Sequence, residues 1–401
     1  MYPVLMEWLN VFARWIHVIA GIMWVGNSML FNWLDRNLLS GDSLEPNKFG
    51  HTWLLHSGGF YRVEKYISSE LPPVLHWFKW QSYTTWLTGF LLLVVVYYSD
   101  GGSFLIPANH SVLTPGQALA LGLAVVFGGF FVYDLVWRAP FVKKHDLIFG
   151  ALSIAVLFVG IYALHQVFTG RSAYLHVGAM LGTFMAGNVF FHIIPSQKQM
   201  TQAIAEGKGF DMDLSNRAKQ RSIHNNYFTF PLIFTMISNH FGGLYGHEWN
   251  WLILIVLMVT SALVRHFLNI RFDFKHWRAG VGGTLAAAAL VLMVILNPHG
   301  AGAQPAGVGE EGGAPVTFAE ARAIIQQHCL SCHSKWPTDK VLSLATGGVH
   351  YDTPEEIVAM ADRIYFRAVE TKTMPFNNMG TITDEERETL GRWIKQGAKL
   401  E

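Results

Sequence analysis

The chain has 401 residues, of which 51% are hydrophobic and only 14% are charged, well below the charged fraction of about 25% in ordinary soluble domains. Its net charge of +1 offers no strongly basic surface, so we expect no nucleic-acid partner. Residues 1–316 carry 35 charged side chains and residues 317–401 carry 22, which predicts a long membrane region followed by a small soluble domain.

A helix needs about 20 apolar residues to cross a bilayer. Eight stretches come near that length and predict an all-α, eight-helix transmembrane bundle within residues 1–296: 8–34, 80–98, 116–137, 146–168, 174–194, 227–241, 249–268 and 279–296. The first has neither a basic start nor a small-residue cleavage site, so we expect a membrane helix and not a cleaved signal. The sixth is short in apolar residues, and Pro231 interrupts its start.

The distribution of Lys and Arg predicts which loops face the cytoplasm. Of the 19 basic residues before position 317, 17 fall in alternate loops, whereas Arg14 lies inside the first helix and Arg171 in an opposite loop. The basic loops are therefore expected to be cytoplasmic. We accordingly expect a multi-pass protein of the inner (cytoplasmic) membrane whose two termini are periplasmic.

Ionisable residues inside a membrane helix suggest function, because they are costly there. His17 lies in the first predicted helix, with Arg14 one turn before it on the same face. A guanidinium at this place is suited to hold a haem propionate or an anionic substrate. His17 and Arg14 are therefore candidate site residues.

The fifth and sixth predicted helices carry four more histidines near their ends. Antiparallel packing would bring them together in pairs that resemble two b-type haem sites: His176 with His240, and His192 with His224. However, at about 100° per residue the 16-residue spacing puts His176 and His192 on nearly opposite helix faces. The alternative is that these histidines are ordinary interfacial residues.

The first predicted cytoplasmic loop contains His56-Ser57-Gly58-Gly59-Phe60-Tyr61-Arg62-Val63-Glu64-Lys65-Tyr66. The two glycines allow the backbone to approach a ligand closely. Tyr61 offers a stacking ring, Arg62 a bidentate anion clamp and Glu64 a candidate base. The alternative is an amphipathic interfacial helix with solvated charges.

Residues 297–316 are rich in Gly, Pro and Ala and predict a flexible linker. Beyond them, two capping boxes predict the starts of helices: Thr317 with Glu320, and Thr383 with Glu386. Residues 317–401 are therefore expected to form a small all-α domain.

The only two cysteines of the chain occur in Cys329-Leu330-Ser331-Cys332-His333, the attachment signature of c-type haem. The two thiols add to the haem vinyl groups, and His333 becomes the proximal iron ligand. A zinc site would need two more Cys or His at finger spacing, and none follows. Covalent haem c is attached outside the cytoplasm, so we expect residues 317–401 to be a periplasmic cytochrome c domain.

The second axial ligand is expected to be a methionine, because Met/His ligation raises the potential and suits an electron carrier. Met374, followed by Pro375 in a loop, is the preferred candidate, and Met379 is the alternative. Met360 lies in a predicted helix over residues 354–369 and is expected to be core, as is Trp393.

Three segments carry a resemblance to a known family: His56 to Lys65, His76-Trp-Phe-Lys-Trp80, and His224-Asn-Asn-Tyr-Phe-Thr-Phe-Pro231 through Ser238-Asn-His240. With the order of bundle, linker and cytochrome, the chain resembles the bacterial membrane-bound, cytochrome c-linked urate hydroxylases over essentially its whole length. The resemblance implies oxidation of urate to 5-hydroxyisourate, with electrons passing to the fused haem c instead of oxygen. The implied partners are urate, the lipid bilayer and a downstream cytochrome c or terminal oxidase.

The candidate urate residues are Arg62, Tyr61, Glu64, His17 and Arg14, and the alternative function is a respiratory quinol-to-cytochrome c module without purine chemistry. About 30 Å of bilayer hydrocarbon would separate a urate site at Arg62 from the cytochrome. That distance predicts an intermediate b-type haem, held by His17 and a second histidine with Arg14 on a propionate. A urate site open to the periplasm near Arg14 and His17 would need no second haem.

Overall fold

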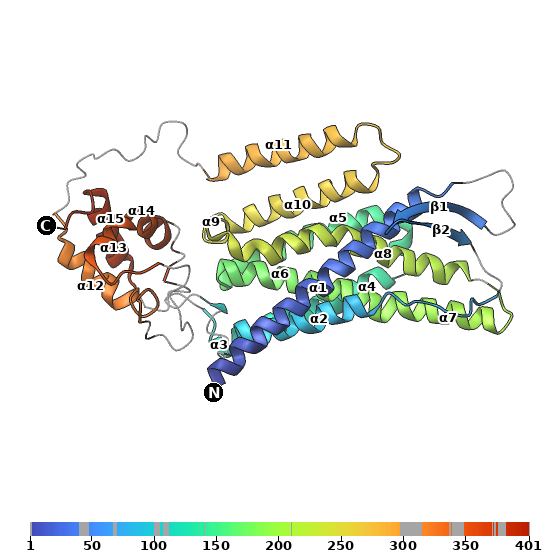
Figure 1. Ribbon diagram of the computed structural model, residues 1–401, viewed down its shortest axis with the longest axis horizontal. Helices are drawn as coiled ribbons and strands as arrows, with labels where there is room; N and C mark the ends of the chain where they lie inside the picture. The colour runs from blue at the N-terminus through green and yellow to red at the C-terminus, as the bar shows by residue number, and fades with distance from the viewer. Residues whose placement is uncertain are drawn as a thin grey trace.

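The computed structural model describes residues 2–39, 48–66, 70–99, 105–106, 112–139, 141–209, 211–296, 315–336, 338, 349–370, 372, 374–375 and 382–400. Most of them are helical. Long helices run side by side in a bundle, a two-stranded hairpin lies at the end of the bundle where α1 ends, and α12 to α15 lie beyond the opposite end (Figure 1).

The helical segments of the bundle follow one another along the chain as α1 (Tyr2–Arg36), α2 (Trp80–Leu93), η1 (Val94–Tyr98), α3 (Pro115–Leu123), η3 (Ala124–Gly128), α4 (Gly129–Arg138), η4 (Val142–Lys144), α5 (Asp146–Val167), α6 (Gly170–Gly187), η5 (Asn188–Ile193), α7 (Ile194–Ala205), α8 (Met212–Ile237), η6 (Ser238–His240), α9 (Gly242–Tyr245), α10 (Asn250–Asn269) and α11 (Trp277–Leu296). The segments η1, η3 and η5 are π-helical insertions in otherwise α-helical rods. Such insertions occur frequently at functional sites.

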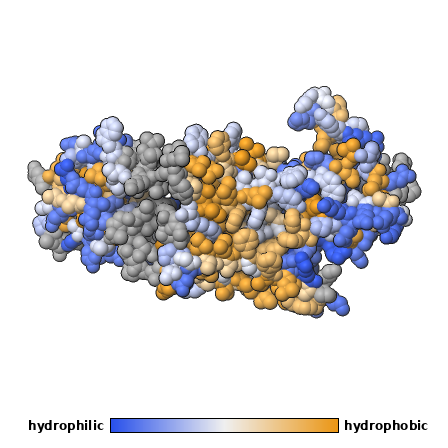
Figure 2. Space-filling model, turned by 90° about the horizontal axis from the view of Figure 1, so that it is seen from below, coloured by the Kyte–Doolittle hydropathy of each residue, from blue (hydrophilic) through white to orange (hydrophobic). Residues whose placement is uncertain are grey.

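Six helical stretches among the described residues are long and apolar enough to cross a membrane: Leu5–Arg36, Pro115–Arg138, Asp146–Val167, Gly170–Ala205, Asn250–Asn269 and Trp277–Leu296. Figure 2 shows the matching surface, an apolar band in the middle of the molecule between more hydrophilic ends. The chain is therefore a multi-pass membrane protein by the length and composition of its helices.

Two of the eight predicted spans do not meet this criterion, although both are helical. Residues 80–98 form α2 and η1. The first turn of α2 contains the polar residues Gln81 and Ser82, so its apolar part is short. Residues 227–241 were expected to form a separate helix, but they are the second half of α8, which starts at Met212 and continues through Pro231. The predicted span 174–194 is also too short, because α6, η5 and α7 form one rod from Gly170 to Ala205.

The prediction of an all-α fold is wrong at the loop after α1. There β1 (Lys48–His56) and β2 (Gly59–Tyr66) form a two-stranded antiparallel sheet. Ser57 (φ 50°) and Gly58 (φ 76°) at the turn both have left-handed backbone, as a two-residue hairpin of type I′ requires. The alternative prediction of an amphipathic helix over these residues is wrong for the same reason.

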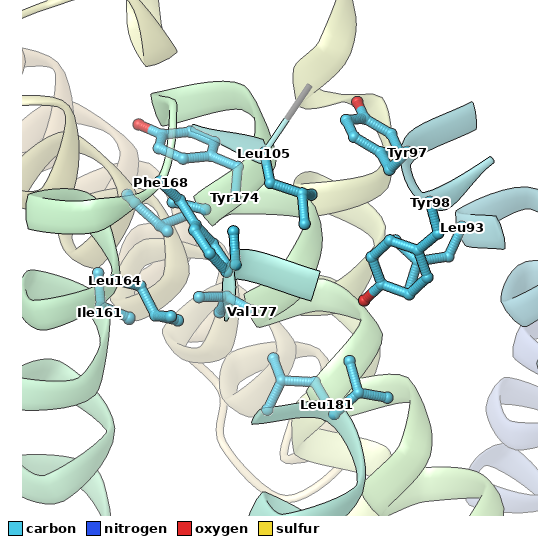
Figure 3. Packing of buried hydrophobic residues seen from close by; sticks show 14 of the residues in the cluster. Leu93, Tyr97, Tyr98, Leu105, Ile161, Leu164, Phe168, Tyr174, Val177 and Leu181 are labelled. Atoms are coloured by element: carbon cyan, nitrogen blue, oxygen red, sulfur yellow. The ribbon is translucent and has the colours of Figure 1, made fainter. Parts of the chain in front are cut away.

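The core of the bundle is built from aromatic and aliphatic side chains of α2 to α6 and α10 (Figure 3). Tyr174, Val177 and Leu181 of α6 are fully or almost fully buried, because α6 is covered by neighbours on several sides. At Gly178 a side chain would come within 2.3 Å of Thr235 Oγ1, so the glycine lets α6 and α8 pack closely. This contact positions both helices beside the site described below.

The C-terminal residues form a second core of their own. Its helices are α12 (Phe318–His328), α13 (Pro354–Ala359), α14 (Ala361–Ile364), η9 (Tyr365–Glu370) and α15 (Asp384–Lys395). The two predicted capping boxes are confirmed at the starts of α12 and α15. Trp393 is 1% exposed in this core and Met360 packs against it, as predicted, but the helix predicted over 354–369 is interrupted at Met360.

Candidate functional site

A cavity of about 330 Å³ lies between α1, α2 with η1, α6 and the end of α8. Most of its wall is apolar. The polar or aromatic-polar side chains that line it are Arg14, His17, Trp24, Thr85, Trp86, Tyr97, Arg171, Thr183, Asn239 and His240. We call it the outer cavity. Two of its lining residues, Arg171 in the first turn of α6 and His240 in η6, belong to the end of the bundle that faces α12 to α15 in Figure 1. Its size and lining are those of a small-molecule site.

His17 is held in one orientation by α2. Its Nδ1 donates to the carbonyl oxygen of Thr85 (2.8 Å) and lies 3.2 Å from Thr88 Oγ1. Gly89 makes room for the ring, since a Cβ there would come 2.8 Å from His17 Cε1. With the proton fixed on Nδ1, the lone pair of Nε2 is left for a proton or a metal.

Two arginines give the outer cavity a positive character. Arg171 Nε donates to Asn239 Oδ1 (2.8 Å), and its guanidinium lies 5.8 Å from the centre of the Tyr97 ring. Arg14 Nη2 donates to Asn10 Oδ1 (3.0 Å) on an exposed part of α1. Among the described residues that line the cavity there is no Asp or Glu. Two cations in a mostly apolar wall favour an anionic ligand.

Aromatic side chains add flat surfaces to the same cavity. Trp86 stacks on Phe90 with ring centroids 5.7 Å apart, and its Nε1 donates to Thr183 Oγ1 (3.0 Å). The hydroxyls of Tyr97 and Tyr98 point in opposite directions (Figure 3). That of Tyr97 is buried and bonds none of the described residues. Flat rings and a donor without a protein partner suit a planar ligand with polar edges.

The hairpin residues predicted to bind urate lie apart from this cavity. Tyr61 and Arg62 are neighbours on β2, so their side chains point to opposite faces of the sheet. Arg62 Nη2 is 2.8 Å from Glu64 Oε1, and Tyr61 is 53% exposed. The structure thus brings Arg62 and Glu64 together, but on an exposed surface without Tyr61.

A second polar cluster, the inner network, lies between α4, η5 and α8 near the basic loops. The buried Asp134 carboxylate accepts hydrogen bonds from three cationic or ionisable side chains: Arg221 (3.0 Å), His192 (2.5 Å) and Arg138 (2.7 Å). Asp134 was not among the predicted site residues. The signal was present, because an acid within an apolar span is as unusual as Arg14 or His17.

Asn188, on η5, extends the inner network. Its amide nitrogen donates to Tyr133 OH (3.0 Å) and to Asn225 Oδ1 (2.9 Å), and its oxygen accepts from Arg221 (3.4 Å). Tyr133 OH is in turn 2.7 Å from His224 Nδ1. Asn188 thus has protein partners for both its amide nitrogen and its amide oxygen.

The last two residues of the string His224-Asn225-Asn226-Tyr227 contact α10. Arg265, 1% exposed, donates to Asn226 Oδ1 (3.2 Å) and Ser28 Oγ (3.4 Å). Tyr227 OH is 2.8 Å from His266 Nδ1. The string therefore joins α8 to α10 as well as to α4 and η5.

The structure brings only one of the two predicted histidine pairs into a common polar cluster. His192 and His224 belong to one network, but both are bonded to protein groups there. His176 bonds Ser172 O through Nδ1 and Tyr98 OH through Nε2, so neither ring nitrogen is left for iron. His240 lines the outer cavity together with His17, whereas His176 does not.

The Cys-x-x-Cys-His segment forms a tight turn at the end of α12. The amides of Cys332 and His333 both donate to the carbonyl of Cys329, at 3.2 and 2.8 Å. His333 Nδ1 donates to Val349 O (3.1 Å), which leaves Nε2 for iron, and burial lowers the pKa of His333, which favours the neutral ring. These residues fit a covalently attached haem with a histidine ligand.

Further observations concern the Cys329 thiol and the candidate second ligand. Burial raises the pKa of the Cys329 thiol to about 12, so it is not a reactive thiolate at neutral pH. The backbone of Met374 is fixed by two bonds, from its amide to Arg367 O (2.9 Å) and from Arg387 Nη1 to its carbonyl (2.8 Å). Met379 lies outside the described residues. No group of three or more His, Cys, Asp or Glu within the described part of the chain forms a metal site.

The helices and the outer cavity define a multi-pass membrane protein with a cavity of small-molecule size that two arginines line. Residues 3–297 match the family described as urate oxidase N-terminal, and the chain belongs to that family. This relationship points to an oxidoreductase acting on urate, as the sequence resemblance implied. Searches of curated proteins and of solved structures found no match.

Proposed function

We propose that the membrane bundle oxidises urate to 5-hydroxyisourate in the outer cavity and passes the electrons to a c-type haem carried by residues 317–401. The observation that supports this best is the cavity itself, inside the segment that matches the family. It combines two arginines, flat aromatic rings and an oriented histidine. Urate is a planar anion at neutral pH and matches each of these features.

We place urate in the outer cavity and not at the hairpin. Arg62 and Glu64 neutralise each other on an exposed surface, where a bound anion would be strongly screened. Arg14 and Arg171 instead line a mostly apolar cavity whose described lining contains no Asp or Glu. An ion pair with urate would therefore be stronger there.

His17 is the candidate general base. When the urate monoanion and water form neutral 5-hydroxyisourate, a C–O bond forms at C5, and one proton and two electrons are released. The Nε2 lone pair of His17 can accept the proton of the attacking water, since Nδ1 is fixed as a donor to Thr85. The arginines would hold the purine so that this water meets C5.

The haem would be held by thioether bonds to Cys329 and Cys332, with His333 as proximal ligand and Met374 as the proposed second ligand. When bound, a c-type haem accepts electrons one at a time, so each urate requires two transfers and a downstream cytochrome c or terminal oxidase. In this proposal residues 1–296 form the membrane domain and residues 297–316 the linker to the cytochrome. The eight-pass topology, with basic loops cytoplasmic and both termini periplasmic, belongs to the same proposal.

The outer cavity supports one alternative occupant. Both His17 and His240 line it, and a b-type haem ligated by His17 would place a propionate near Arg14. Acid-acetone extraction of active protein separates the two possibilities, because it removes non-covalent haem and leaves covalent haem behind. Since the cavity lies at the end of the bundle that faces α12 to α15, we favour urate there without a second haem.

The decisive experiment is an anaerobic assay of the purified, haem-loaded protein. Urate should lose its ultraviolet absorption while the haem c spectrum becomes reduced, with two haems reduced per urate when an excess of oxidised cytochrome is supplied. Reduction of the haem by a quinol, with urate unchanged, would overturn the proposal in favour of a respiratory module. Arg62→Lys serves as the control for the hairpin and should leave urate kinetics unchanged.

A further inference from the structure

The hairpin β1–β2 presents an apolar face to its surroundings. Residues that alternate along both strands share one face of the sheet, and the register places Trp53 opposite Arg62 and Leu55 opposite Phe60. We call this the outer face. Four large side chains on it are more than half exposed: Trp53 (53%), Leu55 (67%), Phe60 (75%) and Tyr66 (55%).

The opposite face is more buried at three positions, although Tyr61 on it is 53% exposed. Thr52 is only 6% exposed, and Leu54 and Val63 are half-buried. An antiparallel sheet with one solvated face normally turns polar side chains to water. Here the more exposed face is the aromatic one, and a two-stranded hairpin alone is at best marginally stable in water. The outer face therefore requires a surface to cover it.

The position of the hairpin identifies that surface. It follows the end of α1 and precedes α2, at the end of the bundle with the basic loops (Figure 1). Lys65 is tied to Asp35 near the end of α1 (2.5 Å), so the strands stay beside the helices. The adjoining end of α1 also carries exposed apolar side chains, such as Leu30 (43%) and Phe31 (43%), in a helix long and apolar enough to cross a membrane. The hairpin thus lies beside a helix end whose exposed apolar side chains suit lipid.

The chemistry of the outer face is that of a membrane interface. Trp and Tyr gather at the headgroup level, where one part of the ring is apolar and another polar. Arg62 stands among them, 5.8 Å from the ring centre of Trp53 and 47% exposed, and one of its terminal nitrogens is paired with Glu64 on the same face (2.8 Å). A guanidinium at this level can pair with lipid phosphate in two parallel hydrogen bonds. We propose that the outer face of β1–β2 is embedded in the headgroup zone of the leaflet at the basic end of the bundle, with the Arg62 guanidinium shared between Glu64 and a phospholipid phosphate.

The test uses two adjacent labelling positions on opposite faces. Phe60→Cys places a bimane fluorophore on the outer face, and Tyr61→Cys is its matched control, since Tyr61 is also more than half exposed. Labelling of the parent chain corrects for Cys329 and Cys332, the only native cysteines. The full haem-loaded protein is reconstituted in vesicles of phosphatidylcholine and phosphatidylglycerol. Leu55→Cys repeats the comparison if Phe60→Cys does not fold.

The expected result is that the label at position 60 is quenched by lipids carrying a nitroxide near the glycerol and is shielded from aqueous iodide. The label at position 61 should show weaker lipid quenching and stronger iodide quenching. Equal iodide quenching at both positions would show that the hairpin stands in water and would overturn the proposal. A label at position 60 that is shielded from both quenchers in native membranes but open to iodide in the vesicles would identify a protein partner instead.

Discussion

The outer cavity and the inner network use the same kinds of side chain for different purposes. Each contains arginine, histidine, asparagine and an aromatic ring within the bundle. In the inner network these groups surround Asp134, and hydrogen bonds within the protein satisfy them. In the outer cavity the cations line an open volume that has no carboxylate among its described residues. An intramembrane cation thus marks a candidate ligand site where it lines an open cavity, and a structural site where a buried carboxylate binds it.

The largest expected effect comes from removing the candidate base. His17→Ala should lower kcat for urate by about 10²–10⁴-fold, because the attacking water loses its proton acceptor. Haem c content and reduction by dithionite should be unchanged. The measurement is anaerobic, urate-dependent haem reduction, with the exposed His145→Ala as the matched control. Undiminished turnover in His17→Ala would move the base elsewhere.

The next effect is on stability and concerns the inner network. Asp134→Asn leaves Arg221, Arg138 and His192 without their carboxylate in a buried site. We expect a loss of about 3–5 kcal/mol in the free energy of unfolding. Thermal unfolding in detergent measures it, with the exposed Glu206→Gln as a control that should change little. Urate kinetics per folded molecule should be normal, and a specific loss of turnover would make the inner network part of the active site.

The third effect tests the anion site. Arg171→Lys keeps the charge but loses the planar guanidinium, so a charge-assisted hydrogen bond to urate should be lost. We expect KM for urate to rise roughly 10–100-fold, corresponding to about 1.5–3 kcal/mol. The matched control is Arg217→Lys, an exposed arginine of α8. An unchanged KM in Arg171→Lys would show that the anion is bound elsewhere.

Local signals predicted many of the helices and part of the site. Hydropathy located six spans, and the Thr317 and Thr383 capping boxes placed two helix starts, because each of these features depends on a few neighbouring residues. The pair Arg14 and His17 was also recognised within one helix. Both line the cavity.

The features that the sequence did not reveal depend on which helices meet. Arg171, Thr183 and Asn239 join Arg14 only through the packing of α1, α2, α6 and α8. A single sequence does not determine that packing. The hairpin was missed for another reason: its glycines were interpreted as a ligand-binding loop, whereas Gly58 serves a left-handed turn position. The strand pattern was masked because both faces of the hairpin carry apolar residues.

The smallest expected effects form a crossed pair that separates the two polar clusters. Thr183→Val keeps the shape of the side chain but removes the acceptor of the Trp86 indole N–H in the outer cavity. Tyr133→Phe removes the hydroxyl that accepts from Asn188 and lies beside His224 in the inner network. Each change removes neutral hydrogen bonds worth about 0.5–1.5 kcal/mol.

If the comparison between the clusters holds, the two losses will appear in different measurements. Thr183→Val should raise KM for urate roughly 2–10-fold, because the Trp86 indole loses the hydrogen bond that orients its ring against the ligand. Its midpoint of thermal unfolding should change little, because ligand or water can replace the acceptor in an open cavity. Tyr133→Phe should lower the stability and leave KM unchanged, because water cannot replace a hydroxyl inside a closed network. A rise in KM with Tyr133→Phe, or a loss of stability alone with Thr183→Val, would show that the clusters do not divide ligand binding from structure in this way.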